Sequence, residues 1–81
     1  MSKLSIFEQL TFVLRDVFEN EELVATPYLV AADVEGWDSL GNVRLFVELE
    51  RKFSVRFSAA EITSLKSVGQ LVDLIEKKKS S

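Results

Sequence analysis

Apolar residues recur at helical spacing over two long stretches of the chain, residues 4–18 and residues 39–53. In each stretch they return every three or four positions, which is the period of one face of an α-helix. The first stretch has Ser2 or Ser5 as a candidate cap, and Glu8 follows Ser5 at the spacing of a capping box. Its apolar stripe consists of Leu4, Phe7, Leu10, Val13, Leu14, Val17 and Phe18. The pattern predicts two amphipathic helices, the second opening at Asp38 and Ser39.

The second of these helices carries two apolar stripes. One consists of Leu45, Leu49 and Phe53, the other of Leu40, Val43 and Val47, and the remaining face bears Arg44, Glu48, Arg51 and Lys52. A small bundle needs to bury only one of the two stripes, so we expect part of the second stripe to lie near the surface, available to a partner.

Two shorter helices are predicted after residue 57, and each opens on a serine cap. Ser58 is followed by Glu61, and Ser67 by Gln70, the spacing of a capping box. Gly69 in the first turn of the last helix suggests close packing there, because glycine is a poor helix former. Residues 53–57 alternate apolar and polar side chains, but a lone strand has no pairing partner, so we expect an extended link.

These elements predict an all-α fold, a small four-helix bundle with three longer helices and one short helix. Residues 19–38 contain the only proline, and their apolar residues follow no sustained helical period. This segment is therefore predicted to be a long loop between the first two helices. We expect a single domain over 1–81, with its core within about 4–76 and a polar tail at 77–81 whose lysines complement the helix dipole.

Composition then restricts the chemistry. The 81 residues include no cysteine and no histidine, which excludes zinc hydrolases, thiol enzymes and Ser/His/Asp hydrolases. Glu8 and Gln9 interrupt the start of the chain where a signal peptide would be apolar, and no stretch approaches the length of a membrane span. We expect a cytoplasmic protein without stable membrane insertion.

Charge is distributed unevenly along the chain. Residues 1–36 hold two bases against seven acids, a net −5, and residues 37–81 hold eight bases against six acids, a net +2. The bases form no stripe interleaved with aromatics, so we expect no nucleic-acid partner. Asp33, Glu35 and Asp38 could hold Ca²⁺ or Mg²⁺ in an enzyme, but they lack EF-hand spacing, and a solvated acidic loop without metal is the favoured interpretation.

The most specific segment is Gly36-Trp37-Asp38-Ser39-Leu40-Gly41. It places a serine at the start of a helix, beside a carboxylate and among backbone N–H groups at the positive end of the helix dipole. That placement suits a phosphate ester on the serine. Asp or Ser at a helix start is also the commonest kind of cap, so the segment alone leaves both interpretations open.

The Asp-Ser-Leu triplet opens an amphipathic helix that follows a first helix and a long loop, and two more helices come after it. This layout resembles the acyl carrier protein family, which includes stand-alone bacterial carriers and the related peptidyl and D-alanyl carriers. The resemblance covers about residues 4–76 and is most specific at 36–53. It implies a non-catalytic carrier, monomeric because it must visit several partners.

The resemblance also implies residue roles. A phosphopantetheinyl transferase would move 4′-phosphopantetheine from coenzyme A onto Ser39, with Asp38 helping the transferase recognise the site. The arm's thiol would hold an acyl group as a thioester for acyl-loading, acyl-transfer or condensing enzymes. The residues that match the family's recognition face are Leu40, Val43, Arg44, Val47, Glu48 and Arg51. The apolar residues placed either to line an acyl pocket or simply to fill the core are Phe46, Phe57, Ile62, Leu65 and Val68.

Two departures from the family pattern bear on the pathway. General fatty-acid carriers have a strongly acidic second helix, whereas residues 39–53 carry three bases and two acids. Trp37 before Asp38 is more reminiscent of peptidyl, D-alanyl and specialised acyl carriers. The hypothesis is a stand-alone acyl carrier of a specialised fatty acid, lipid or polyketide pathway. The alternatives are a peptidyl or D-alanyl carrier, or an unmodified helical interaction domain that would tolerate Ser39→Ala.

Overall fold

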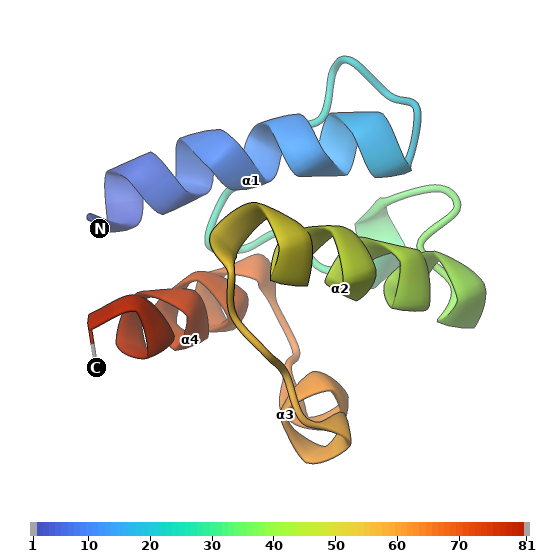
Figure 1. Cartoon of the computed structure of the whole chain (residues 1–81). Coiled ribbons are helices and arrows are strands. Elements are labelled where there is room, and N and C mark those ends of the chain that lie inside the picture. The colour runs from blue at the N-terminus through green and yellow to red at the C-terminus, as the bar shows by residue number, and fades with distance from the viewer. Residues whose placement is uncertain (1, 81) are drawn as a thin grey trace.

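The computed structural model describes residues 2–80 and contains four α-helices (Figure 1). The elements in chain order are α1 (Lys3–Val17), a 3₁₀ turn η1 (Ala31–Asp33), α2 (Ser39–Phe53), α3 (Ala59–Ser64) and α4 (Val68–Ser80). Helix α1 packs against both α2 and α4, and the short α3 lies to one side of these three (Figure 1). No strand occurs within residues 2–80. The predicted all-α fold with three longer helices and one short helix is confirmed.

Helix α1 begins at the Ser2 cap, whose hydroxyl accepts a hydrogen bond from the Ser5 backbone N–H at 3.2 Å. The predicted apolar stripe is wrong at its first position, because Leu4 is 72% exposed and Ile6 is fully buried instead. The face that meets the other helices continues from Ile6 through Leu10 and Leu14. Leu4 lies two residues before Ile6, about 200° around the helix, and therefore faces solvent.

Helix α2 has the bounds that the sequence predicts. Its buried stripe of Leu45, Leu49 and Phe53 is at most 1% exposed. The helix ends at Ser54, which adopts a left-handed conformation with φ of 55°, so the chain turns sharply away after Phe53. The second stripe of this helix remains at the surface and is described with the site.

The segment between α1 and α2 is held against the bundle rather than looping freely. Thr11 on α1 accepts a hydrogen bond from the Ala25 backbone N–H at 2.9 Å, and the Arg15 Nε donates to the Leu23 carbonyl at 2.7 Å. Leu23 and Ala25 are thereby buried. The η1 turn within this segment was not predicted. The loop therefore packs against the helices and contributes Leu23 and Ala25 to the hydrophobic core.

The same loop fixes the start of α4. The backbone N–H of Gly69 donates to the Pro27 carbonyl at 3.1 Å, and that of Val68 donates to Leu29 at 2.9 Å. A methyl group on Gly69 would lie only 2.8 Å from the Pro27 oxygen. The predicted close packing at Gly69 is confirmed, with the loop's backbone as the neighbour.

Helix α4 continues through the lysines at its end. The residues predicted as a polar tail are helical up to Ser80, and the Lys79 ammonium group donates to the Phe53 carbonyl at the end of α2, at 2.9 Å. The segment is therefore part of the bundle as far as Ser80. None of the helices in the described part of the chain is long and apolar enough to cross a membrane.

Candidate functional site

Ser39 is the first residue of α2, and its side chain is exposed. The capping role belongs to Asp38, whose Oδ1 accepts a hydrogen bond from the Gly41 backbone N–H at 2.9 Å. The Ser39 hydroxyl makes no hydrogen bond with any residue of the segment 2–80. The sequence left open which of the two residues caps the helix. The structure assigns the cap to Asp38 and leaves the Ser39 hydroxyl available for chemistry.

Two glycines set the position of this helix start. Gly36 has a φ of 90°, a conformation that side chains disfavour, and it turns the chain into the site. A methyl group on Gly41 would overlap the Gly36 carbonyl oxygen and would lie 3.0 Å from the Phe18 ring. The loop thus crosses directly over the first turn of α2, and the close approach holds residues 37–39 in place.

Trp37 and Asn42 form a pair beside Ser39. The indole ring of Trp37 stacks on Phe18 with ring centres 5.4 Å apart, and its Nε1–H donates to the Asn42 Oδ1 at 2.9 Å. The sequence marked Trp37 only as a feature of certain carriers and did not single out Asn42. Asn42 is a polar residue in the first turns of the helix, on a face that is otherwise apolar, and this pattern could have marked it as a site residue.

The exposed face of α2 is apolar at its centre. Leu40, Val43 and Val47 are 70%, 60% and 49% exposed, as the second stripe predicted. Arg44, expected on this face, donates to the Val17 carbonyl at the end of α1, at 3.3 Å, so its charge is partly engaged within the bundle.

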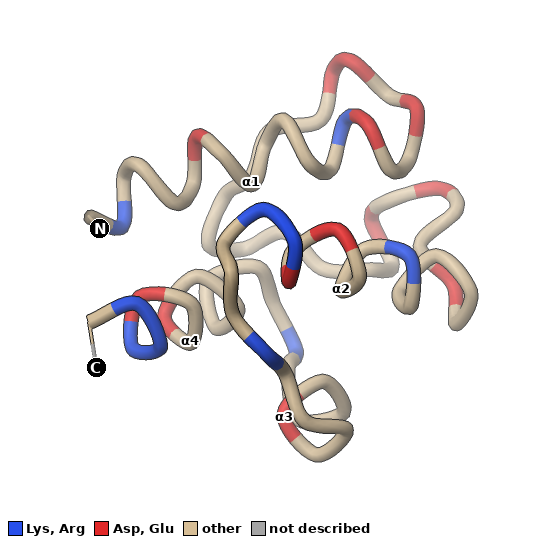
Figure 2. The backbone as a smooth tube through the Cα atoms, viewed as in Figure 1, with Lys and Arg blue, Asp and Glu red and all other residues tan. Residues whose placement is uncertain are grey.

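Charged residues of both signs border this face, whereas the loop after α1 is acidic (Figure 2). Glu48 and Arg51 form an ion pair at 3.8 Å between side chains that remain in contact with solvent. Figure 2 shows acidic and basic residues interleaved along α2, and acidic residues gathered in the loop that follows α1. The face of α2 is therefore mixed in charge, and the acidic surface lies elsewhere.

A pocket of about 300 Å³ lies beside α2, between the loop that contains η1 and helix α3. Phe46, Ile62 and Leu65 are among its lining residues, which is one of the two positions that the sequence left open for them. Phe57 and Val68 do not line it: Phe57 packs edge-on against Phe46 at 5.0 Å, and Val68 is fully buried in the core. The residues that line the pocket are Val30, Ala31, Trp37, Asn42, Phe46, Ile62, Thr63, Leu65, Lys66, Ser67 and Leu71.

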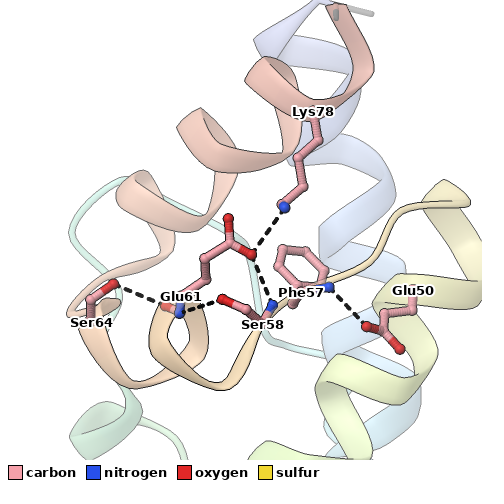
Figure 3. A network of polar contacts seen from close by, with 6 residues as sticks. All are labelled: Glu50, Phe57, Ser58, Glu61, Ser64 and Lys78. Atoms are coloured by element: carbon pink, nitrogen blue, oxygen red, sulfur yellow. Dashed lines mark hydrogen bonds and ion pairs between the residues drawn. The ribbon is translucent and has the colours of Figure 1, made fainter.

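Polar contacts hold α3, whose Ile62 and Thr63 line this pocket, against the rest of the bundle (Figure 3). The Glu61 carboxylate accepts from the Ser58 backbone N–H at 2.8 Å and from the Lys78 ammonium group of α4 at 3.0 Å. The bond from Ser58, followed by that from Lys78, holds the pKa of Glu61 below its ordinary value. Glu50 on α2 accepts from the Phe57 backbone N–H at 2.9 Å. Sequence spacing predicted only the local capping box, because Glu50 and Lys78 approach through the fold.

Two of the three acidic residues considered as metal ligands accept hydrogen bonds from the backbone. Asp33 accepts from the Val30 backbone N–H at 3.4 Å, and Asp38 caps α2. Over residues 2–80 no three side chains of the metal-binding types come together in a group that could hold an ion. Helix capping and turn formation account for the polar contacts of these two carboxylates.

The chain matches known carrier proteins over most of its length. Residues 33–75 match the family described as "Phosphopantetheine attachment site". A curated protein named "Acyl carrier protein" from Thermotoga maritima is 30% identical over 77 residues, which are 95% of each chain. Another of the same name from Coprothermobacter proteolyticus is 32% identical over 76 residues, 94% of this chain and 93% of that one.

The fold is similar to a solved structure as well. The solution NMR structure of holo acyl carrier protein from Geobacter metallireducens matches with a TM-score of 0.86 and 38% sequence identity, covering 91% of this chain and 85% of that chain. The resemblance inferred from the sequence is thereby confirmed. The chain belongs to the acyl carrier protein family, whose members are carriers rather than catalysts and whose cofactor is covalently attached 4′-phosphopantetheine.

Proposed function

We propose that this carrier holds its 4′-phosphopantetheine arm on Ser39 and receives it from a phosphopantetheinyl transferase. The observation that carries the proposal is the exposed, unbonded Ser39 hydroxyl at the first residue of α2, with the cap supplied by Asp38. When bound, the arm supplies the thiol that the cysteine-free chain lacks, and that thiol holds the cargo as a thioester.

The start of α2 suits the phosphodiester of such an arm. The backbone N–H groups of the first turn have no partner within the helix, and the helix dipole is positive there. Asp38 engages the N–H of Gly41 and leaves those of Ser39 and Leu40 for other acceptors. An anion on Ser39 is therefore stabilised by the backbone, as at other phosphate-binding helix ends. We assign to Asp38 a second role in recognition by the transferase.

The exposed stripe of Leu40, Val43 and Val47 serves as the docking face for the transferase and for the acyl-handling enzymes. Its centre is apolar, and Glu48 and Arg51 border it, the arrangement of an interface core with a polar rim. The stripe begins next to Ser39 on the same helix. An enzyme bound there would hold its active site close to the arm.

The cargo is an acyl group of a specialised fatty acid, lipid or polyketide pathway. The pocket lined by Phe46, Ile62 and Leu65 has the volume of a small ligand site and is apolar at these positions, which suits an acyl chain. Helix α2 carries three basic and two acidic residues, a net +1. Interface charge governs partner choice, so enzymes that select a strongly acidic carrier helix would discriminate against this one.

The attachment is tested by incubating the purified chain with coenzyme A and a broad-specificity phosphopantetheinyl transferase, followed by intact mass measurement. We expect the wild type to gain one arm and Ser39→Ala to gain none. Ser2→Ala is the matched control, because it also removes a serine hydroxyl at the start of a helix, and it should gain the arm. A gain that persists in Ser39→Ala, or no gain in folded wild type, contradicts the assignment.

The pathway is tested with the loaded protein. General fatty-acid synthase enzymes should load and elongate it less efficiently than their own carrier. Equal efficiency would refute the specialised role. Loading by an amino-acid-activating ligase, without loading by acyl-transfer enzymes, would instead support the alternative of a peptidyl or D-alanyl carrier.

A further inference from the structure

A surface hollow leads from Ser39 to the pocket. The hollow is lined by Ala31, Trp37, Asp38, Ser39 and Asn42. Three of these residues, Ala31, Trp37 and Asn42, also line the pocket beside α3. The two depressions are therefore adjoining, and the Trp37–Asn42 pair stands at the boundary between them. Asn42 is three residues after Ser39, so both side chains lie on the same side of α2, one turn apart.

The side-chain amide of Asn42 uses its oxygen in a hydrogen bond and leaves its NH₂ group available. The Trp37 indole nitrogen can only donate, so the Asn42 oxygen must face it and the Asn42 NH₂ group must point elsewhere. That NH₂ group has no acceptor among residues 2–80. In this part of the chain, every buried side-chain nitrogen or oxygen has a hydrogen-bond partner. Because the Asn42 NH₂ group has no partner, it is exposed to solvent.

We propose that Trp37 and Asn42 position the phosphopantetheine arm on its way from Ser39 to the pocket. The arm contains two secondary amides separated by short aliphatic segments. Asn42 Nδ2 donates to one of the amide carbonyls, and the indole ring packs against the neighbouring aliphatic segment. The Trp37–Asn42 hydrogen bond fixes the direction of the amide, and the stack on Phe18 fixes the ring. The inference rests on the proposed attachment at Ser39.

A purely structural role for Asn42 makes a different prediction. If the side chain served only to accept from Trp37, any acceptor at position 42 would suffice. Asn42→Asp keeps the acceptor and removes the donor, and a negative charge is tolerated in the first turns of a helix. Asn20→Asp is the matched control, because Asn20 also uses its oxygen as an acceptor, from the Glu22 N–H at 3.0 Å, in the loop after α1.

The test is NMR of ¹⁵N,¹³C-labelled protein before and after attachment of unlabelled arms, with coenzyme A or octanoyl-coenzyme A as donor. The chain has one tryptophan and two asparagines, so the indole N–H and the side-chain amides are readily assigned. We expect the Trp37 indole and Asn42 amide signals to shift on attachment and isotope-filtered NOEs to join the arm to the Trp37 ring. The Asn20 amide should not shift, and transferase-treated Ser39→Ala should show none of these changes.

Asn42→Asp should gain the arm by mass but lose the NOEs to the Trp37 ring, whereas Asn20→Asp should retain them. Intact NOEs in Asn42→Asp would overturn the role of the donor. Wild type that carries the arm by mass, yet shows unshifted Trp37 and Asn42 signals, would overturn the positioning role and leave the attachment at Ser39 standing. Failure of the mass to increase would overturn both proposals.

Discussion

Gly41→Ala should destabilise the protein, although alanine is the better helix former. Gly41 is buried in the first turn of α2, directly beneath the loop that carries Gly36. A methyl group there would overlap the Gly36 carbonyl oxygen and press on the Phe18 ring at 3.0 Å. Relief requires the loop backbone to move, because a carbonyl group cannot rotate aside as a flexible side chain would.

The magnitude follows from two opposing terms. Replacement of glycine by alanine within a helix gains at most about 1 kcal/mol. Forcing a methyl group into a packed site costs about 1–3 kcal/mol, and here the displaced loop also holds Trp37 in its stack on Phe18. We expect a net loss of about 1–2 kcal/mol, which corresponds to a fall in Tm of roughly 5–15 °C for a domain of this size.

Thermal and urea unfolding followed by circular dichroism at 222 nm measure this loss. Gly69→Ala is the comparison variant, because its methyl group would lie 2.8 Å from the Pro27 oxygen, a milder overlap, and its loss should be smaller. The displaced loop precedes Ser39, so Gly41→Ala should also slow attachment of the arm. A Gly41→Ala protein at least as stable as wild type would refute the reasoning that the loop contact fixes the site.

Three further outcomes are expected. Asp38→Ala removes the cap of α2 and should cost about 1 kcal/mol in urea unfolding, whereas Ser39→Ala should stay within about 0.5 kcal/mol of wild type. The pKa of Glu61 is lowered in the folded state, so this carboxylate contributes fully to the free energy of unfolding above its unfolded-state pKa. That contribution is lost as the pH falls through the folded-state pKa. When the free energy of unfolding is measured against pH, Lys78→Met should therefore lose less stability than wild type below about pH 4.5. Leu40→Ala should leave Tm unchanged, because the side chain is 70% exposed, yet reduce kcat/KM of the transferase.

The start of α2 could be predicted from sequence because its determinants are local. An Asp-Ser pair before an apolar period indicates a helix start, and the cap forms between residues three positions apart, Asp38 and Gly41. The rotation of α1 was harder to predict, since Leu4, Ile6 and Phe7 are all apolar and a helical period can be drawn through more than one of them. Only packing against α2 and α4 selects the face through Ile6.

The remaining features of the site depend on contacts between distant parts of the chain. Lys78 reaches Glu61 across 17 residues, and Arg44 reaches Val17 across 27 residues. No local pattern specifies such pairs, because exposed charged residues occur at many positions that would satisfy the same spacing. The sequence could not decide between pocket and core for a related reason. The helical period indicates that Val68 is apolar and faces inward, but not whether it borders a cavity.

The structure separates the two requirements of a carrier between different parts of the chain. The proposed attachment residue, Ser39, is presented in one position because it starts a helix whose inner stripe is almost completely buried. The proposed acyl pocket is lined in part by α3, a six-residue helix with no fully buried residue. This helix is held in place through Glu61 and through the bond from Phe57 to Glu50 just before it. Segments with few buried contacts open at lower free energy than the core does. Opening of α3 would therefore change the volume of the pocket, while α2 and Ser39 with it would stay held by the packing of α2 on α1 and by the Asp38 cap.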